Sequence, residues 1–184
     1  PGADFLFTGT TDHLFEIGWA IRGANATAEV FLPDPNLTEQ LSGNQLRFTW
    51  NSLPGGLSSV SGTLVYTLVE NSANLATLEV VMTLTNNNEV NESINLFNMA
   101  DIDLQPTAGD DRVNGGLGGL IVTQDGSIRV VRYTGVGAAA FLVRPFGATD
   151  LGVVLSDASI TNFDNSGLSF GPGDMTAGYQ CAFT

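Results

Sequence analysis

The sequence predicts an all-β fold, namely an antiparallel β-sandwich or jelly-roll-like domain of about a dozen strands. Three observations support this prediction. Apolar and polar residues alternate with a period of two along most of the chain, as they do in half-buried strands. Short runs rich in Asn, Asp and Gly separate these segments, and such runs form turns. No helical segments alternate with the strands, which argues against an α/β fold.

Length and charge limit the classes of function to consider. The chain has 184 residues, which corresponds to about one domain, so we expect residues 1–184 to form a single β-sandwich domain. Six basic residues, all Arg, stand against nineteen acidic ones, for a net charge of −13. Because so few cations are present to neutralise phosphates, the composition argues against nucleic acid as a partner.

Alternation predicts the strands of the first half of the chain. They cover residues 15–21, 45–51, 64–68, 77–85 and 94–104. The segment 71–74 has the composition of a hairpin connection between the third and fourth of these strands. The aromatic residues of the first two strands fall on the apolar face, so they are expected in the core rather than on an exposed sugar-binding surface. They are Phe15, Trp19, Phe48 and Trp50.

A hairpin is predicted after the middle of the chain. Residues 120–123 and 128–131 are β-branched runs on either side of Gln124-Asp125-Gly126-Ser127. Asp-Gly between such runs is a strong hairpin signal, and both of its central residues are expected at positive φ. The glycine-rich segment 115–119 lacks the pattern of a phosphate-binding loop, so we expect a flexible crossing there.

The last third of the chain contains two further strands and a helix. Residues 141–146 predict a strand, and Pro145 favours an edge position or the end of that strand. The segment 148–156 is the one stretch with helical character, and Asp150 is suited to cap it. Residues 175–183 alternate again and predict the last strand.

The single cysteine and the composition bear on where the protein resides. Cys181 is the only cysteine, so no disulfide forms within the chain. It is either a small buried residue of the last strand or the site of an interchain disulfide in an oxidising exterior. No apolar run reaches the ~18 residues of a membrane span. The chain begins with Pro1, as after signal-peptide cleavage, and sequons at Asn25, Asn36 and Asn91 would matter in a glycosylating export pathway.

Three groups of short motifs are spread along the chain. Asp12-His13-Leu14-Phe15 is followed by Trp19, Arg22 and Glu29. Residues 95–104 read NLFNMADIDL, and residues 171–176 read GPGDMT. Together they resemble a family of secreted bacterial β-sandwich proteins whose members often carry a PEP-CTERM-type sorting tail. The resemblance implies export and residence at the cell surface or in an extracellular matrix, and it implies no catalytic activity.

An acidic group in the central motif is the candidate metal site. Asp101 and Asp103 lie two residues apart, so on a strand both project from the same face. The loop after Leu104 can bring Asp110 or Asp111 back onto them. Three carboxylates with nearby carbonyls suit Ca²⁺, which takes six to eight oxygen ligands. The alternative interpretation is a solvated strand edge whose like charges prevent aggregation.

Enzymatic interpretations find little support in the sequence. The Asp101–Asp103 pair has a spacing compatible with a glycosidase, but nothing in the sequence separates the two pKa values as acid and base catalysis requires. His13 is the only histidine, and the G-x-S-x-G nucleophile elbow is absent. We therefore expect no enzymatic activity.

The leading functional hypothesis is a secreted structural protein that self-assembles as a filament, sheath, or surface-layer or matrix subunit. Residues 1–9 form an apolar N-terminal extension in which Phe5, Leu6 and Phe7 place apolar groups on both faces of a strand. Such a segment can add to the sheet of a second copy or pair within its own chain. The alternative hypothesis is a carbohydrate-binding or calcium-dependent adhesive module at the cell surface, with extracellular polysaccharide as partner.

Overall fold

The computed structural model describes residues 6–7, 11–12, 14–72, 75–104 and 108–184. It confirms the all-β prediction, because the described residues form four antiparallel sheets, one short α-helix and a 3₁₀ turn. The central sheet has five strands in the order β13-β14-β9-β3-β4. Its strands are β13 (Ala140–Pro145), β14 (Met175–Phe183), β9 (Ile94–Asp101), β3 (Glu16–Gly23) and β4 (Val30–Phe31).

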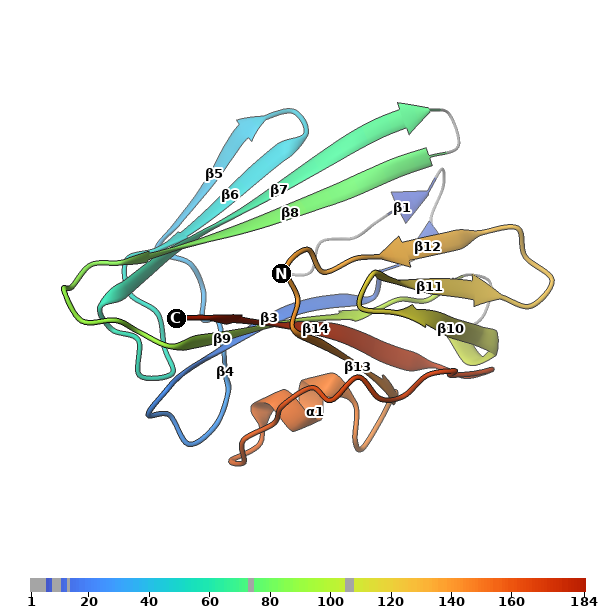
Figure 1. Cartoon of the computed structure of the whole chain (residues 1–184). Coiled ribbons are helices and arrows are strands. Elements are labelled where there is room, and N and C mark those ends of the chain that lie inside the picture. Colours follow the sequence, from blue (N-terminus) through green and yellow to red (C-terminus); the bar gives the residue numbers. More distant parts are fainter. Residues whose placement is uncertain (1–5, 8–10, 13, 73–74, 105–107) are drawn as a thin grey trace.

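Two further sheets lie over the same face of this central sheet (Figure 1). The four-stranded sheet has the order β5 (Leu37–Ser42), β6 (Gln45–Trp50), β7 (Val60–Ser72) and β8 (Leu75–Asn86). The three-stranded sheet has the order β10 (Asp111–Gly116), β11 (Gly119–Gln124) and β12 (Val130–Tyr133). A separate two-stranded sheet pairs β1 (Leu6–Phe7) with β2 (Thr11–Asp12).

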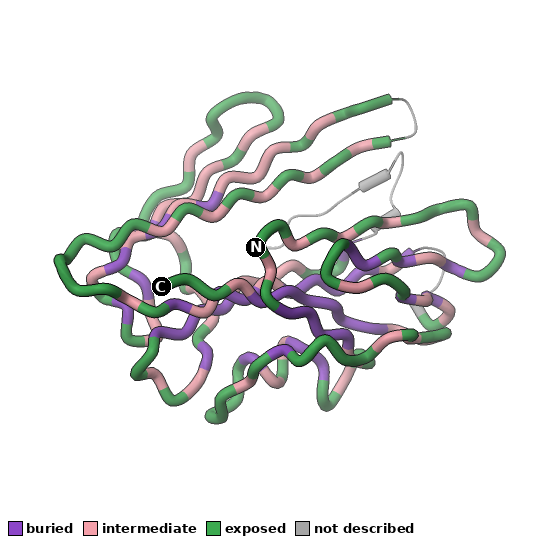
Figure 2. The backbone as a smooth tube through the Cα atoms, in the orientation of Figure 1, coloured by how far each residue is buried: buried purple, intermediate pink, exposed green. Residues whose placement is uncertain are grey.

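The opposite face of the central sheet is covered by helix α1 (Leu151–Ser156) and the segment that follows it (Figure 1). The Asp150 carboxylate accepts a hydrogen bond from the Val153 amide at 2.8 Å, so the predicted cap is confirmed. Leu151 and Leu155 of this helix pack against Phe97 and Met99 of β9. The central sheet is therefore apolar on both faces, and Figure 2 shows the buried residues concentrated along it.

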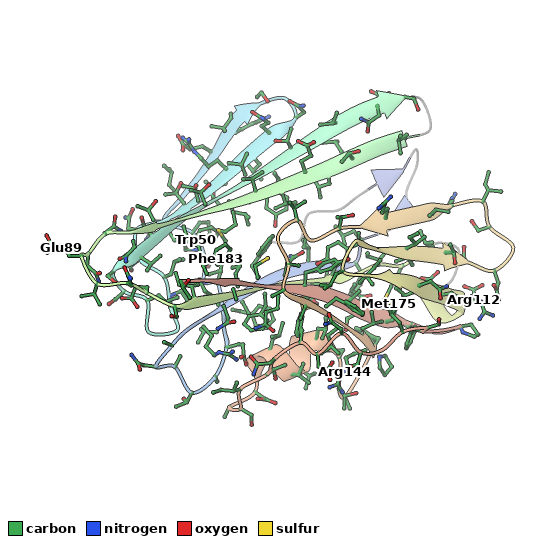
Figure 3. The ribbon with its side chains drawn as sticks, in the orientation of Figure 1. Trp50, Glu89, Arg112, Arg144, Met175 and Phe183 are labelled. Atoms are coloured by element: carbon green, nitrogen blue, oxygen red, sulfur yellow. The ribbon has the colours of Figure 1, made fainter. Side chains whose placement is uncertain are left out.

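Each covering layer makes its own core with the central sheet. The three-stranded sheet packs Val113, Leu120 and Val122 against Ala100, Ile102 and Tyr179. The four-stranded sheet packs Trp50 and Leu64 against Ile21 and Leu96, and Figure 3 places Trp50 at the end where these two sheets meet. All three layers depend on β9, which explains why the central motif is almost continuously buried.

Several local predictions are wrong. Phe15 lies just outside β3 and is 62% exposed, so it is not a core residue. Segment 115–119 is no flexible crossing, because it forms the ends and the tight turn of the β10–β11 hairpin. In the Asp125-Gly126 turn, Gly126 has a φ of 76° whereas Asp125 is not at positive φ. The Asp125 carboxylate instead forms an ion pair with Arg112.

Candidate functional site

An acidic cluster lies at one end of the central sheet. Asp101 is the last residue of β9, and its strand neighbours in register are Glu16 of β3 and Thr176 of β14. One carboxylate oxygen each from Asp101, Asp103 and Asp174 lies within 4.8 Å of the others. Asp103 lies beyond the end of β9, so the alternation of side chains along a strand does not set its direction. Its carboxylate nevertheless lies beside that of Asp101.

Asp174 is a member of the cluster that the sequence pattern did not predict. Asp174 precedes β14 directly, and β14 pairs with β9, so the pairing of these two strands brings the carboxylates together. The segment 171–174 also packs closely on β10. A Cβ on Gly171 would lie 2.3 Å from the Asp111 carbonyl oxygen, and its φ is 102°, so only glycine fits there. The Gly173 amide donates a hydrogen bond to the same carbonyl at 3.0 Å.

Asp110 and Asp111 differ in their environment. The Asp110 carboxylate accepts a hydrogen bond from the Gln124 side-chain amide at 2.9 Å and is not part of the three-oxygen group. Asp111 is fully buried, and its Oδ2 accepts a hydrogen bond from the Leu104 amide at 3.0 Å. The negative charges of Asp103, Asp110 and Asp174 contribute to raising the pKa of Asp111. Of the two residues that the sequence offered as the third carboxylate, Asp110 and Asp111, Asp111 therefore borders the cluster.

Burial raises the pKa values in the cluster. Burial, followed by repulsion from Asp103, Asp174, Glu16 and Asp150, raises the pKa of Asp101 to about 8. Burial, opposed by the Leu104 hydrogen bond, raises the pKa of Asp111 to about 7. Burial also raises the pKa of Asp174. These residues thus form a buried group of acids whose negative charges repel one another.

The open end of the four-stranded sheet is a second unusual feature. In Figure 1 this sheet meets the central sheet at one end and splays away from it toward the other. Burial falls along its inner face accordingly. Trp50 and Leu64 near the closed end are 5% and 3% exposed, whereas Leu46 and Leu68 farther out are 37% and 45% exposed. Apolar and polar residues thus continue to alternate along these strands beyond the point where the central sheet covers their inner face.

Strand β8 forms one edge of this sheet. It spans twelve residues and, among the described residues, pairs only with β7. Glu79 is its only charged residue, and it contains neither Pro nor Gly. Natural edge strands are usually short, charged or interrupted by Pro or a bulge, because a long regular edge offers free backbone groups to another strand. By these criteria β8 is an unprotected edge.

Arg22 and Glu29, and Gln180 of β14, have structural roles in the fold. Arg22 and Glu29 form a buried ion pair, and the Arg22 guanidinium also donates to Asn162 Oδ1 at 2.6 Å. The Gln180 side chain accepts a hydrogen bond from the Phe163 amide at 2.8 Å. These contacts attach the segment around Asn162 and Phe163 to β3 and β14, which accounts for these polar residues without a ligand.

The remaining predicted site residues are accounted for as follows. Phe5 lies outside the described residues, and Leu6–Phe7 pairs with Thr11–Asp12 of its own chain. Cys181 is half-buried beside the core of the four-stranded sheet, and burial raises the pKa of its thiol. Asn25, Asn36 and Asn91, the sequon residues, are all exposed.

Comparisons with known proteins identify no relative of this chain. A scan against protein-family models, a search of curated proteins and a search of solved structures each returned no match. Within the described ranges, no helix has the length and apolar character needed to cross a lipid bilayer.

Proposed function

We propose that this protein is a secreted structural subunit that self-assembles into a filament, sheath, surface layer or matrix outside a bacterial cell. The observation that carries the proposal is the edge of β8, whose twelve residues present one charge and no interruption. Strand addition to such an edge satisfies the backbone hydrogen-bonding groups of both partners. The half-exposed Leu46 and Leu68 on the same sheet give an added strand an apolar surface to cover.

The occupant that we propose for this edge is the N-terminal segment of a second copy. Phe5, Leu6 and Phe7 are consecutive apolar residues, and a strand that is apolar on both faces needs cover on both sides. Within its own chain, β1 of this segment pairs with β2. Insertion of this segment into the sheet of a second copy would give a head-to-tail contact. Such contacts build an open fibre when the rotation between successive subunits does not close a ring.

Electron microscopy of the purified protein tests the proposal, with three variants for comparison. We expect the wild type to form fibres or sheets. Deletion of residues 1–8 and the double substitution Val81→Lys/Thr83→Lys on β8 should each leave a folded monomer that does not assemble, because lysines on an edge strand prevent pairing. Val81 is exposed in the monomer, so its replacement should not disturb folding.

The matched control is Ile121→Lys. Ile121 is also exposed, but it lies on β11, whose two edges are both paired. This variant should assemble like the wild type. A wild type that stays monomeric at high concentration contradicts the proposal. Unchanged assembly of the β8 double variant shows that the contact lies elsewhere, and unfolding of the deletion variant shows that residues 1–8 belong to their own fold.

One observation favours the alternative, a calcium-dependent or carbohydrate-binding adhesive module. Phe15 is 62% exposed, and its amide donates a hydrogen bond to the Asp101 carbonyl at 3.0 Å. An exposed aromatic ring thus adjoins the acidic cluster, and such rings stack on sugars. Retention on immobilised polysaccharide that is lost in Phe15→Ala and on addition of chelator would support this alternative over self-assembly.

A further inference from the structure

We propose that Asp101, Asp103 and Asp174 bind one Ca²⁺ ion. The three oxygens that lie within 4.8 Å of one another have the spacing that a single ion requires. Calcium–oxygen distances are about 2.3–2.6 Å, so two ligands of one ion lie at most about 5 Å apart. The proposal is independent of self-assembly, because the site lies within one chain.

Buried carboxylate oxygens without partners are the second observation. Among the described residues, Oδ1 of Asp101 and Oδ1 of Asp111 are buried and accept no hydrogen bond. The two residues are only 2% and 0% exposed. A buried polar atom without a partner costs about 1–3 kcal/mol, and more when charged. The charges of Asp103, Asp110 and Asp174 raise the pKa of Asp111, so Asp111 borders the acidic group without belonging to its three-oxygen set.

No arginine is among the charged groups that act on Asp101. The only cationic side chains other than His13 are six arginines, and three of them are held elsewhere. Arg22 pairs with Glu29, Arg47 with Glu39 and Arg112 with Asp125. All of the charged neighbours that act on Asp101 are acidic and raise its pKa. A divalent cation would therefore offset the repulsion between Asp101 and its acidic neighbours.

The ligand set favours calcium over magnesium. The carboxylates come from the last residue of β9, from Asp103 just beyond it and from the residue before β14. Calcium accepts six to eight oxygens in irregular geometry, whereas magnesium requires a small octahedron and keeps several waters. An ion held in this way would join the end of β9 to the start of β14. We therefore expect calcium to stabilise the fold.

Thermal unfolding and calorimetric titration with CaCl₂ alone test the proposal on wild type, Asp103→Asn, Asp174→Asn and a control. The control Asp34→Asn removes the same charge from an exposed position outside the cluster. For the wild type we expect saturable binding and a higher Tm with CaCl₂ than with chelator, since a ligand of the folded state stabilises it. The control should behave like the wild type.

For each cluster variant, the change in Tm relative to the wild type should have opposite signs without and with calcium. Without calcium, Asp103→Asn and Asp174→Asn should unfold at the same temperature as the wild type or higher, because one repulsive charge is gone. With calcium, the increase in Tm should largely disappear, with at least about a tenfold loss of affinity. A merely structural role would instead lower Tm under both conditions.

Three results would overturn the proposal. The first is a wild type whose Tm and titration heat do not respond to CaCl₂. The second is a calcium-dependent increase in Tm that both cluster variants retain in full. The third is an equal response to MgCl₂ at the same concentration, which would exclude a calcium-selective site.

Discussion

Asp101 and Asp174 lie on neighbouring segments of the central sheet, and their carboxylates come close enough to share one cation. Asp101 ends β9, whereas Asp174 precedes β14, the antiparallel partner of β9. The end of one strand and the start of the other therefore meet at the same edge. This relationship places the acidic cluster at one end of the central sheet, where Asp101 is buried and its ionisation affects stability.

Stability should depend on pH in calcium-free buffer. The pKa values of Asp101 and Asp111 are raised to about 8 and about 7, whereas carboxyls of the unfolded chain titrate near 4. The folded state then binds protons more tightly, so the stabilisation is complete below about pH 4 and is lost as the pH rises through 7 and 8. Denaturant unfolding should show the free energy of unfolding falling between about pH 5 and 9, by roughly a few kcal/mol.

The charged groups around Asp101 define the control for this pH dependence. Glu16, Asp103, Asp150 and Asp174 act on Asp101, and Arg144 lies in the same row of the sheet beyond Thr176. Asp101→Asn removes the central titrating group with little change of shape, so its stability should vary less over this pH range. A wild-type stability that rises from pH 5 to 9 would contradict the prediction.

Arg22→Met should destabilise the protein strongly. Arg22 and Glu29 form an ion pair whose side chains are 8% and 0% exposed, so the substitution leaves a buried carboxylate without its cation. Such changes cost about 3–5 kcal/mol. Arg47→Met breaks the half-exposed pair with Glu39 and should cost less than about 1 kcal/mol. Similar losses for both variants in urea unfolding would show that the Arg22 pair is not the anchor that its burial indicates.

Gly178→Ala tests how closely the layers approach at β14. A Cβ at Gly178 would lie 2.6 Å from the Asn98 carbonyl oxygen and 2.8 Å from Leu151 Cδ1, so the strand or the helix must shift. We expect a loss of about 1–3 kcal/mol, as in other overpacked cores. At Gly43 a Cβ meets no atom within 4 Å, so Gly43→Ala should change the free energy of unfolding by no more than about 0.5 kcal/mol.

Cys181 should react slowly in the folded protein. Burial raises the pKa of its thiol, so little of the reactive thiolate is present at neutral pH. Reaction with a chromogenic disulfide reagent should be much slower under native conditions than in denaturant. The competing interpretation, an interchain disulfide, predicts instead a covalent dimer on a non-reducing gel that Cys181→Ser abolishes.

The alternation of the sequence determined the class of fold and most of the strands. Leu46, Phe48 and Trp50, for example, fix both the strand and the face that turns inward, because side chains of a strand alternate by geometry alone. The capped helix after Asp150 was likewise visible locally, since its cap bonds an amide only three residues on. The pair Asp101 and Asp103 stood out as acids within an otherwise apolar motif.

Only the tertiary structure decided which strands are neighbours, and the candidate site depends on that. Asp174 joins Asp101 because β14 pairs with β9, and no local pattern specifies pairing between segments so far apart in the chain. Phe15 keeps the apolar phase of β3 yet is exposed, because burial requires a layer above it as well as the correct face. For the same reason Leu46 and Leu68 remain partly exposed where the four-stranded sheet leaves the central sheet. Periodicity gives the direction of a side chain, whereas the packing of distant segments gives its surroundings.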